Sequence, residues 1–416
     1  MKKTLIYVCL SILLTLQGCF GMWTDENASF AENMVDLQGG DFRFFNSKGL
    51  MFQSYSQPRS SADIYNDKGE VIGRDFAEEW MKDTADRLNH DRMRLIKGNL
   101  NQNALIVFNE RAQEGSWWAN QDLSKIFITT DFYDFHEQGV IPANRILGNA
   151  RIYKMFKSID GGQNFKQLNW PKARPIKQVL FDQTGQYGYV IGGNRELWRS
   201  SDAGETWKKI VIPQQWQLMM VTDDEIINSI VKTFDAYYLD EKTKTLYLSC
   251  FKYDPKQSRN EVYALPWNEA LTDMNQLIPI VVIADVYITA IQSAPEQGLY
   301  FLTEKFDFSD FNLQSNKKSA QFIYLSKDKK QHLVELGDRL MLRHLYQGKD
   351  GVLVIVGSKV SESYLRFEDM YLISTDQGQS WSFHNNESSA TGQTFDTQTN
   401  RLWKLENAKL YSKQLD

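Results

Sequence analysis

The sequence predicts an all-β fold made of repeated units, and three observations predict it. An octapeptide with one shared pattern occurs three times without gaps. Asp202 of the second copy lies 42 residues after Asp160 of the first, and Asp376 lies 174 residues after Asp202, close to four further steps of that length. Short apolar runs bounded by Gly, Asn and Asp recur between the copies, as expected for β-strands separated by turns.

Residues 1–18 have the pattern of a signal peptide. Two lysines precede the apolar run Leu5–Leu16, which is too short to span a bilayer because a spanning helix needs roughly 20 apolar residues. The junction Gly18-Cys19 resembles the bacterial lipoprotein signal, in which the Cys is lipidated and becomes the new N-terminus. The resemblance implies a lipid anchor at Cys19 and, because Phe20 follows, sorting to the outer membrane. The alternative is a secretory signal that is cut elsewhere.

The net charge limits the class of partner, and the cysteines limit how the fold can be stabilised. The chain has 416 residues and a formal net charge of −5. This slight acidity argues against a nucleic-acid partner, which usually requires a basic surface. Once Cys9 is removed with the signal and Cys19 is lipidated, Cys250 has no partner for an intrachain disulfide. We therefore expect packing alone to stabilise the exported fold, with Cys250 as a buried thiol.

We expect residues 19–40 to form a lipidated tether and residues 41–416 to form one domain. A short helical insertion is expected near residues 75–90, because Asp75-Phe76-Ala77-Glu78 has the pattern of a capping box. The C-terminal segment 401–411 is expected to pair with strands near residues 42–52. Such pairing would remove exposed sheet edges.

Each octapeptide follows a strand-like run and has the form Ser-x-Asp-x-Gly-x-Thr/Ser/Asn-Trp/Phe. This pattern resembles the Asp-box, or BNR, repeat of sialidase-type β-propellers. The resemblance implies a structural turn, in which Ser and Asp bond to backbone groups, Gly adopts a positive φ and the aromatic ring packs into the core. The residues implied are Ser158, Asp160, Gly162, Phe165, Ser200, Asp202, Gly204, Trp207, Ser374, Asp376, Gly378 and Trp381.

The resemblance and the period together predict a β-propeller of six or seven blades, with seven favoured, because propeller blades repeat at roughly 40–50 residues. A degenerate octapeptide is expected at Ser326-Lys327-Asp328, and copies expected near 245 and 287 are not visible. The approximate repeat units are 100–170, 176–212, 230–278, 280–336 and 340–386.

Sialidases belong to the same family, which implies three arginines, a Tyr–Glu pair and an acidic proton donor in a catalytic site. The Phe/Tyr-Arg-Ile-Pro element of that family is not matched by Phe42-Arg43-Phe44-Phe45 or by Arg145-Ile146-Leu147, since both lack the Pro. We therefore assign no catalytic residue. The five His residues show no zinc-binding spacing, so we expect neither a metal site nor a cofactor.

Long insertions are expected at 110–150, 303–320 and 357–369, and insertions of this size are usually functional or disordered. The acidic-aromatic stretches Asp131–Phe135 and Phe306–Phe311 could bind sugars or a basic protein, or pack back on the sheets. We predict a lipid-anchored, periplasm-facing propeller that binds a protein partner through its inter-strand loops. The partner would be an envelope assembly component, or a toxin neutralised by an immunity protein. A sialidase-like glycoside hydrolase and a non-catalytic polysaccharide-binding propeller are the alternatives.

Overall fold

The structure is a computed structural model. It describes residues 24–27, 42–45, 49–56, 64–65, 71–73, 92–99, 102–112, 114–133, 151–170, 176–192, 196–212, 236–252, 258–267, 272–305, 319–360, 367–385, 392–406 and 409–415. Cys19 and the helix expected near 75–90 lie outside these ranges. Within them, every regular element longer than three residues is a β-strand. None of the short helical turns there has the length to cross a bilayer.

The described residues form seven four-stranded antiparallel sheets. The first contains β2 (Phe42–Phe45), β3 (Gly49–Ser56), β6 (Arg92–Asn99) and β7 (Gln102–Arg111). The second contains β8 (Glu114–Ala119), β9 (Ile126–Tyr133), β10 (Arg151–Ser158) and β11 (Lys166–Leu168). The third contains β12 (Ile176–Phe181), β13 (Gly188–Gly192), β14 (Leu197–Ser200) and β15 (Lys208–Ile210).

The fourth sheet contains β16 (Tyr237–Asp240), β17 (Thr245–Lys252), β18 (Arg259–Pro266) and β19 (Val281–Ala284). The fifth contains β20 (Val286–Ser293), β21 (Leu299–Lys305), β22 (Ser319–Leu325) and β23 (Gln331–Asp338). The sixth contains β24 (Leu340–Gln347), β25 (Leu353–Val360), β26 (Phe367–Ser374) and β27 (Ser382–Asn385). The seventh contains β28 (Gly392–Asp396), β29 (Arg401–Glu406), β30 (Lys409–Gln414) and β1 (Thr24–Asn27).

The remaining regular elements are small. A separate two-stranded sheet pairs β4 (Ile64–Tyr65) with β5 (Val71–Gly73). Three short 3-10 turns occupy Met274–Gln276, Pro295–Gln297 and Lys349–Gly351.

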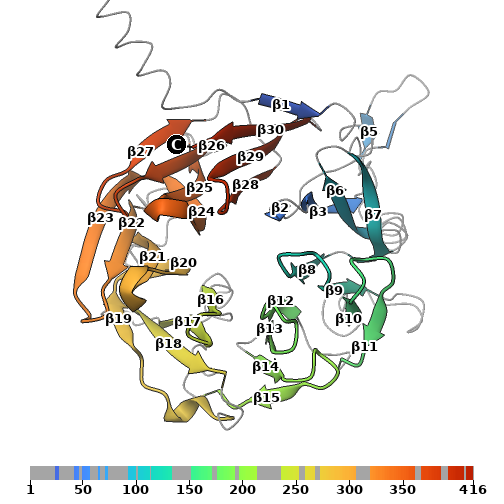
Figure 1. The fold of residues 1–416 in the computed structure, drawn as a ribbon, viewed down its shortest axis with the longest axis horizontal. Coiled ribbons are helices and arrows are strands. Elements are labelled where there is room, and N and C mark those ends of the chain that lie inside the picture. Colours follow the sequence, from blue (N-terminus) through green and yellow to red (C-terminus); the bar gives the residue numbers. More distant parts are fainter. Residues whose placement is uncertain are drawn as a thin grey trace, which may run out of the picture.

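The sheets stand side by side in a ring, with the first strand of each nearest the central axis (Figure 1). Contacts between neighbouring sheets include β8 with β12, β20 with β24 and β2 with β28, all of them inner strands. Radially arranged four-stranded sheets define a β-propeller, so the predicted fold class is confirmed. The sequence expectation was six or seven blades, and the described residues hold seven such sheets.

The two ends of the chain meet in the seventh sheet. Strand β1 pairs antiparallel with β30, with Thr24 opposite Ser412 and Asp25 opposite Tyr411. We expected strands near residues 42–52 in this position, but β2 and β3 belong to the first sheet. β1 lies inside the stretch 19–40 that we expected to be a tether. Its sequence Thr-Asp-Glu-Asn shows no apolar alternation because it is the outermost strand of its sheet.

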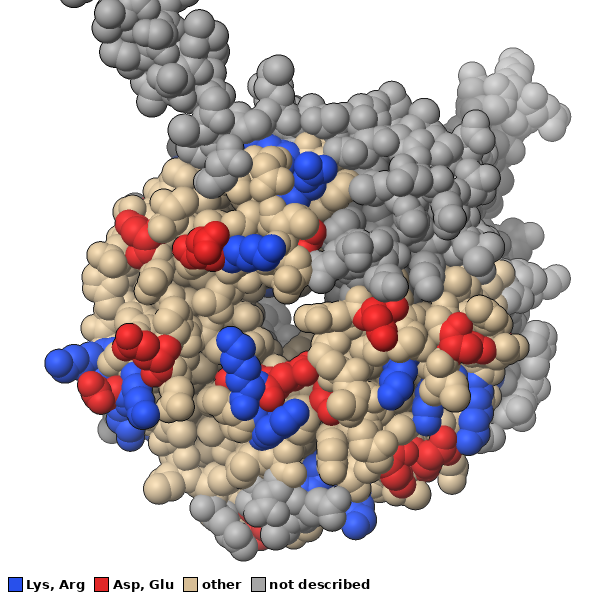
Figure 2. All heavy atoms as spheres, in the orientation of Figure 1, with Lys and Arg blue, Asp and Glu red and all other residues tan. Residues whose placement is uncertain are grey.

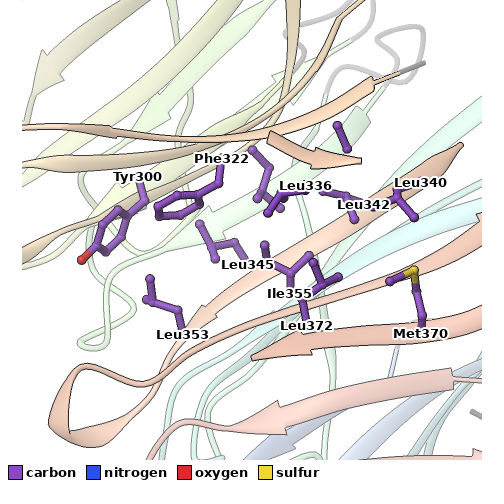
Figure 3. Close-up of a cluster of buried hydrophobic side chains, with 12 residues drawn as sticks. Tyr300, Phe322, Leu336, Leu340, Leu342, Leu345, Leu353, Ile355, Met370 and Leu372 are labelled. Carbon is purple, nitrogen blue, oxygen red and sulfur yellow. The ribbon is translucent and has the colours of Figure 1, made fainter. Parts of the chain in front are cut away.

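Apolar side chains fill the spaces between adjacent sheets. Figure 3 shows one such cluster, in which Tyr300 and Phe322 of the fifth sheet meet Leu345 and Leu353 of the sixth. Similar clusters join the second sheet to the third and the third to the fourth. Burial of one such side chain contributes roughly 1.5–3 kcal/mol. Cys250 is buried and makes no disulfide, so packing stabilises this part of the fold.

The repeat boundaries predicted from the sequence need two corrections. The unit predicted at 100–170 begins too early, because β7 belongs to the first sheet. The unit predicted at 230–278 ends too early, because β19 is its fourth strand. Both errors concern outer strands, whose apolar residues indicate a strand but do not indicate the sheet to which that strand belongs.

Candidate functional site

The three octapeptides occupy equivalent places in their sheets. Residues 158–165 join β10 to β11, residues 200–207 join β14 to β15, and residues 374–381 join β26 to β27. In each case the segment connects the third strand of a sheet to the fourth. The degenerate copy expected at residues 326–328 also lies at this place, between β22 and β23, where the Lys330 N–H bonds to Ser326 Oγ at 3.1 Å. The missing copies near 245 and 287 fall inside strands β17 and β20.

One set of hydrogen bonds builds the first octapeptide. Ser158 Oγ donates to Asp160 Oδ1 at 2.7 Å and accepts the Gly162 N–H at 2.9 Å. Asp160 accepts the Asn164 N–H at Oδ1 (3.0 Å) and the Asn164 side-chain amide at Oδ2 (2.8 Å). The carboxylate thus bonds on both oxygens to its own turn.

The other two octapeptides repeat this set. Ser200 Oγ donates to Asp202 at 2.8 Å, and Ser374 Oγ donates to Asp376 at 2.8 Å. The Gly204 and Gly378 N–H groups donate to these serines at 2.8 and 2.7 Å. Both aspartates also accept from the backbone and the hydroxyl of the seventh residue, which is Thr206 or Ser380. Asn, Thr and Ser interchange there because each supplies a side-chain donor.

The hydrogen bonds change the acidity of the three aspartates. The backbone N–H of Asn164, its side-chain amide and the Ser158 hydroxyl together lower the pKa of Asp160 to about 2. Burial opposes the ionised form of Asp202 and Asp376, but the bonds from Thr206 and Ser380 outweigh it and lower both pKa values. All three carboxylates are therefore ionised near neutral pH and serve the turn.

The glycine and the aromatic residue of each octapeptide pack against the preceding sheet. Gly378 has φ +88°, and a Cβ there would lie 2.2 Å from a ring carbon of Phe322. Trp381 contacts the same ring edge-on, with 5.0 Å between ring centroids. Phe165 contacts Phe108 of the first sheet in the same way, at 5.1 Å. These residues therefore join neighbouring sheets.

A second group of aspartate turns was missed by the sequence analysis. Asp182, Asp240 and Asp396 are buried and follow or end the first strand of their sheets. Asp240 accepts the Lys242 N–H at 2.9 Å and the Thr243 hydroxyl at 2.9 Å. Asp182 accepts the Gln186 N–H and the Thr184 hydroxyl. Asp396 accepts the Gln398 N–H and the Thr399 hydroxyl. The available signal was an Asp followed by Thr two or three residues later at the end of an apolar run.

Both groups of turns lie on one face of the ring, which we call the Asp-turn face. In a four-stranded antiparallel sheet, the first-to-second and third-to-fourth connections leave from the same end. Hydrogen bonds join the two kinds of turn, since the Gly161 N–H donates to Ser124 O at 3.0 Å and the Ala203 N–H donates to Gln186 O at 2.9 Å. Lys349 N–H donates to Asn400 Oδ1 at 2.8 Å across two neighbouring sheets.

The opposite face carries the long connections, and we call it the long-connection face. Residues 134–150 join β9 to β10, residues 213–235 precede β16, and residues 306–318 join β21 to β22. These residues lie outside the described ranges, but the strand ends that flank them are placed. The connections on the Asp-turn face are at most seven residues long, except the one between β18 and β19. The two faces therefore differ in the amount of chain they carry.

The predicted insertions were too wide. β8 and β9 lie within 110–150, and β9 includes Asp131 of the acidic-aromatic stretch Asp131–Phe135. β25 and β26 extend into the insertion expected at 357–369 and leave residues 361–366 between them. These strand ends contain buried polar residues such as Thr130, Asp131 and Ser358, which concealed the strands in the sequence. The stretch Phe306–Phe311 lies outside the described residues.

The structure contains one Tyr–Glu pair that invites comparison with a sialidase site. The Tyr263 hydroxyl donates to Glu261, which also pairs with Lys252 (2.5 Å) and Arg259 (2.9 Å). Burial opposes ionisation of Glu261, but its three partners outweigh this and lower its pKa. Burial and Glu261 raise the pKa of Tyr263, which makes the phenol a poor nucleophile.

This pair does not reproduce the sialidase arrangement. Glu261 and Tyr263 are buried side chains of β18, the third strand of its sheet, whereas a catalytic pair would face the central axis. Arg259 contacts the pair by donating from Nε to Glu261 at 2.9 Å. The pair and its partners Lys252 and Arg259 lie within the fourth sheet, on β17 and β18.

Charges of both signs are mixed on the surface. Figure 2 shows Lys and Arg interspersed with Asp and Glu over the described part of one face, around a central opening. One example is Glu205, which pairs with Lys157 at 3.2 Å and with Lys166 at 2.8 Å. No large area of one sign is visible in this view, so the described surface there offers no simple electrostatic attraction for a highly charged partner.

Comparisons with known proteins bear on the fold. No protein-family model matches the chain, and no curated protein matches it. The GH74 xyloglucanase from Xanthomonas campestris is similar in structure, with a TM-score of 0.54 and 10% identity over 94% of this chain and 53% of that one. A GH74 enzyme from Niastella koreensis gives a TM-score of 0.51 and 10% identity over 95% of this chain and 53% of that one.

The chain has a β-propeller fold. It spans about half the length of both GH74 structures. The match to the structure of YCF48 bound to a D1 peptide covers 92% of this chain and 92% of that one, at 10% identity and a TM-score of 0.48. At this identity the likenesses show the fold alone. Membership of the Asp-box family and the lipoprotein signal remain predictions from the sequence.

Proposed function

We propose that this chain is a lipid-anchored propeller of a bacterial envelope that binds a protein partner with its long-connection face. The observation that carries the proposal is the difference between the two faces. The Asp-turn face consists of short turns, apart from the β18–β19 connection, and the aspartates of the octapeptide turns bond to their own backbone. The other long connections leave the opposite ends of the strands.

Physical reasons favour the long-connection face for binding. Connections of this length are uncommon in compact domains unless they have a function. The ring of packed sheets supplies a rigid frame, and binding residues are commonly carried on loops held by such a frame. The partner's class, either an envelope assembly component or an incoming toxin, follows from the anchor at Cys19. That anchor rests on the residue pattern at positions 1–19.

A loop replacement tests this proposal. Lys305 and Ser319 are directly paired at the ends of β21 and β22, so an Asn-Gly turn can replace residues 306–318 without separating the strands. We expect the mature chain with this turn to fold and to capture its partner from envelope extract at least about tenfold less well, because a large part of the contact is lost. Quantitative mass spectrometry of the captured proteins measures the effect.

The matched control is the double substitution Lys329→Ala, Lys330→Ala in the exposed β22–β23 turn at the other end of β22. Capture by this variant should equal that of the unmodified chain. Loss of the partner with the control but not with the loop replacement would contradict the proposal. Hydrolysis of a sialic-acid or glucan substrate by the purified chain would instead support a glycoside hydrolase.

A further inference from the structure

The position of β1 determines where the N-terminal segment leaves the ring. β1 is the outermost strand of the seventh sheet, and Thr24 lies opposite Ser412 of β30. Gln414, two residues further along β30, pairs with Arg401 and donates to Thr399 O at 2.7 Å. Thr399 belongs to the β28–β29 turn, which is part of the Asp-turn face. The chain therefore enters β1 from the side of the Asp-turn face and runs toward the long-connection face.

The length of chain before β1 is short. Five residue steps separate Cys19 from Thr24, which span about 18 Å at full extension. Thr24 lies two residues from the Asp-turn end of β30, about 7 Å in strand rise. A straight path thus places Cys19 roughly 10 Å beyond the Asp-turn face.

The opposite path needs more chain than is available. From Ser412 toward the long-connection face, β30 continues for three residues to Lys409, about 10 Å. The chain would first have to reverse its direction, and a tight reversal takes about four residues. Residues 20–23 would be used up by the reversal, which leaves too little chain to clear that face. Every connection on the Asp-turn face except the one between β18 and β19 is at most seven residues long, so most of this face can approach a flat surface closely.

We propose that the Asp-turn face is the side of this propeller held next to a phospholipid surface, with the long-connection face directed away from it. The inference rests on the proposed lipid anchor at Cys19 and specifies how that anchor presents the binding face. The tether, rather than an affinity of the face for lipid, sets the orientation.

Two exposed lysines near opposite ends of β25 can measure this orientation. Lys349 lies in the turn before β25 on the Asp-turn face, and Lys359 lies near the other end of β25. An eight-residue strand separates its ends by about 26 Å. Cys250 is buried and Cys19 would be acylated, so a donor fluorophore should label only the introduced cysteine in Lys349→Cys or Lys359→Cys.

The acylated full chain is reconstituted into phosphatidylethanolamine–phosphatidylglycerol vesicles that contain an acceptor-labelled lipid. We expect energy transfer from position 349 to exceed that from position 359 at least about twofold, given the separation along β25. Equal transfer, or greater transfer from position 359, would overturn the inference. A Gly/Ser insertion of about 20 residues after Met22 should remove the difference, because such a linker is flexible.

Vesicle flotation separates this inference from the proposed anchor. The unmodified chain should float with the vesicles, and the Cys19→Ala variant should not. If flotation does not depend on Cys19, the anchor and the orientation are both refuted. If flotation depends on Cys19 but transfer does not favour position 349, the orientation alone is refuted.

Discussion

At the scale of single residues, each shared position of the octapeptide is explained by the contacts that its residue makes. The serine bonds to both the aspartate and the glycine N–H, and the seventh residue donates to the second carboxylate oxygen. The glycine is required twice, because its φ is positive and because the preceding sheet lies against it. The octapeptide pattern therefore indicates both a turn and the contact of that turn with a neighbouring sheet.

A pair of glycine substitutions separates these two requirements. Gly378→Ala places a Cβ in the left-handed region and 2.2 Å from the Phe322 ring, whereas Gly337→Ala has φ +117° and nothing within 4 Å. We expect Gly337→Ala to lower the free energy of unfolding by about 1–3 kcal/mol from backbone strain alone. Gly378→Ala should cost about 1–3 kcal/mol more because of overpacking. Urea unfolding measures both, and equal losses would contradict the predicted role of the contact with Phe322.

At the scale of elements, the aspartate turns make the stability of the fold depend on pH. Because hydrogen bonds lower the pKa of Asp160 in the folded state to about 2, its ionised form stabilises the turn. This contribution is complete above the ordinary pKa of 3.8 and is lost as the pH falls toward 2. The pKa values of Asp202 and Asp376 are also lowered, so the ionised forms of these residues stabilise their turns in the same way. The protein should therefore lose stability in acid through its turns.

The substitution Asp160→Asn tests this link. The asparagine cannot be protonated in this range, so the variant should lose less stability than the unmodified chain between about pH 4 and pH 2. At neutral pH the variant should be the less stable of the two, because the charged acceptor is gone. Urea midpoints across this pH range measure the difference, and parallel pH curves for the two proteins would refute the assignment.

At the scale of the whole molecule, closure of the ring depends on one strand of four residues. β1 covers the outer edge of β30, and an uncovered edge strand invites pairing with another chain. The same strand fixes the point from which a lipidated N-terminus would leave the ring. Closure and the proposed orientation therefore share a structural cause.

Two deletions test whether β1 is needed for closure of the ring. Removal of residues 20–27 should lower the thermal midpoint and promote self-association, because the edge of β30 loses its hydrogen-bonding partner. Removal of residues 20–23 leaves β1 intact, so the midpoint should equal that of the unmodified chain. Scanning calorimetry and light scattering on both proteins measure this. Equal behaviour of the two deletions would show that β1 is dispensable for closure.

Prediction from the sequence succeeded for features that depend on hydrogen bonds between residues close together in the chain. Ser200, Asp202 and Gly204 bond within one turn, so their spacing alone indicates that turn. Prediction failed for β1, whose sequence Thr-Asp-Glu-Asn has no apolar pattern. It also failed for the sheet to which β19 belongs, because β19 pairs with β18 instead of beginning the next repeat unit. It also missed Asp182 and Asp240, because the spacing to their threonine partners varies from two to three residues.

The sequence by itself determined the all-β class, the repeating turn and the octapeptide residues that build it, because these depend on bonds between near neighbours along the chain. Only the tertiary structure decided which strand closes the ring, which glycine lies against which neighbouring aromatic side chain, and that the long connections other than β18–β19 share one face. Those features depend on contacts between residues far apart in the sequence, such as Thr24 with Ser412 and Gly378 with Phe322. Local pattern does not encode such contacts, since any outer strand can cover an open edge.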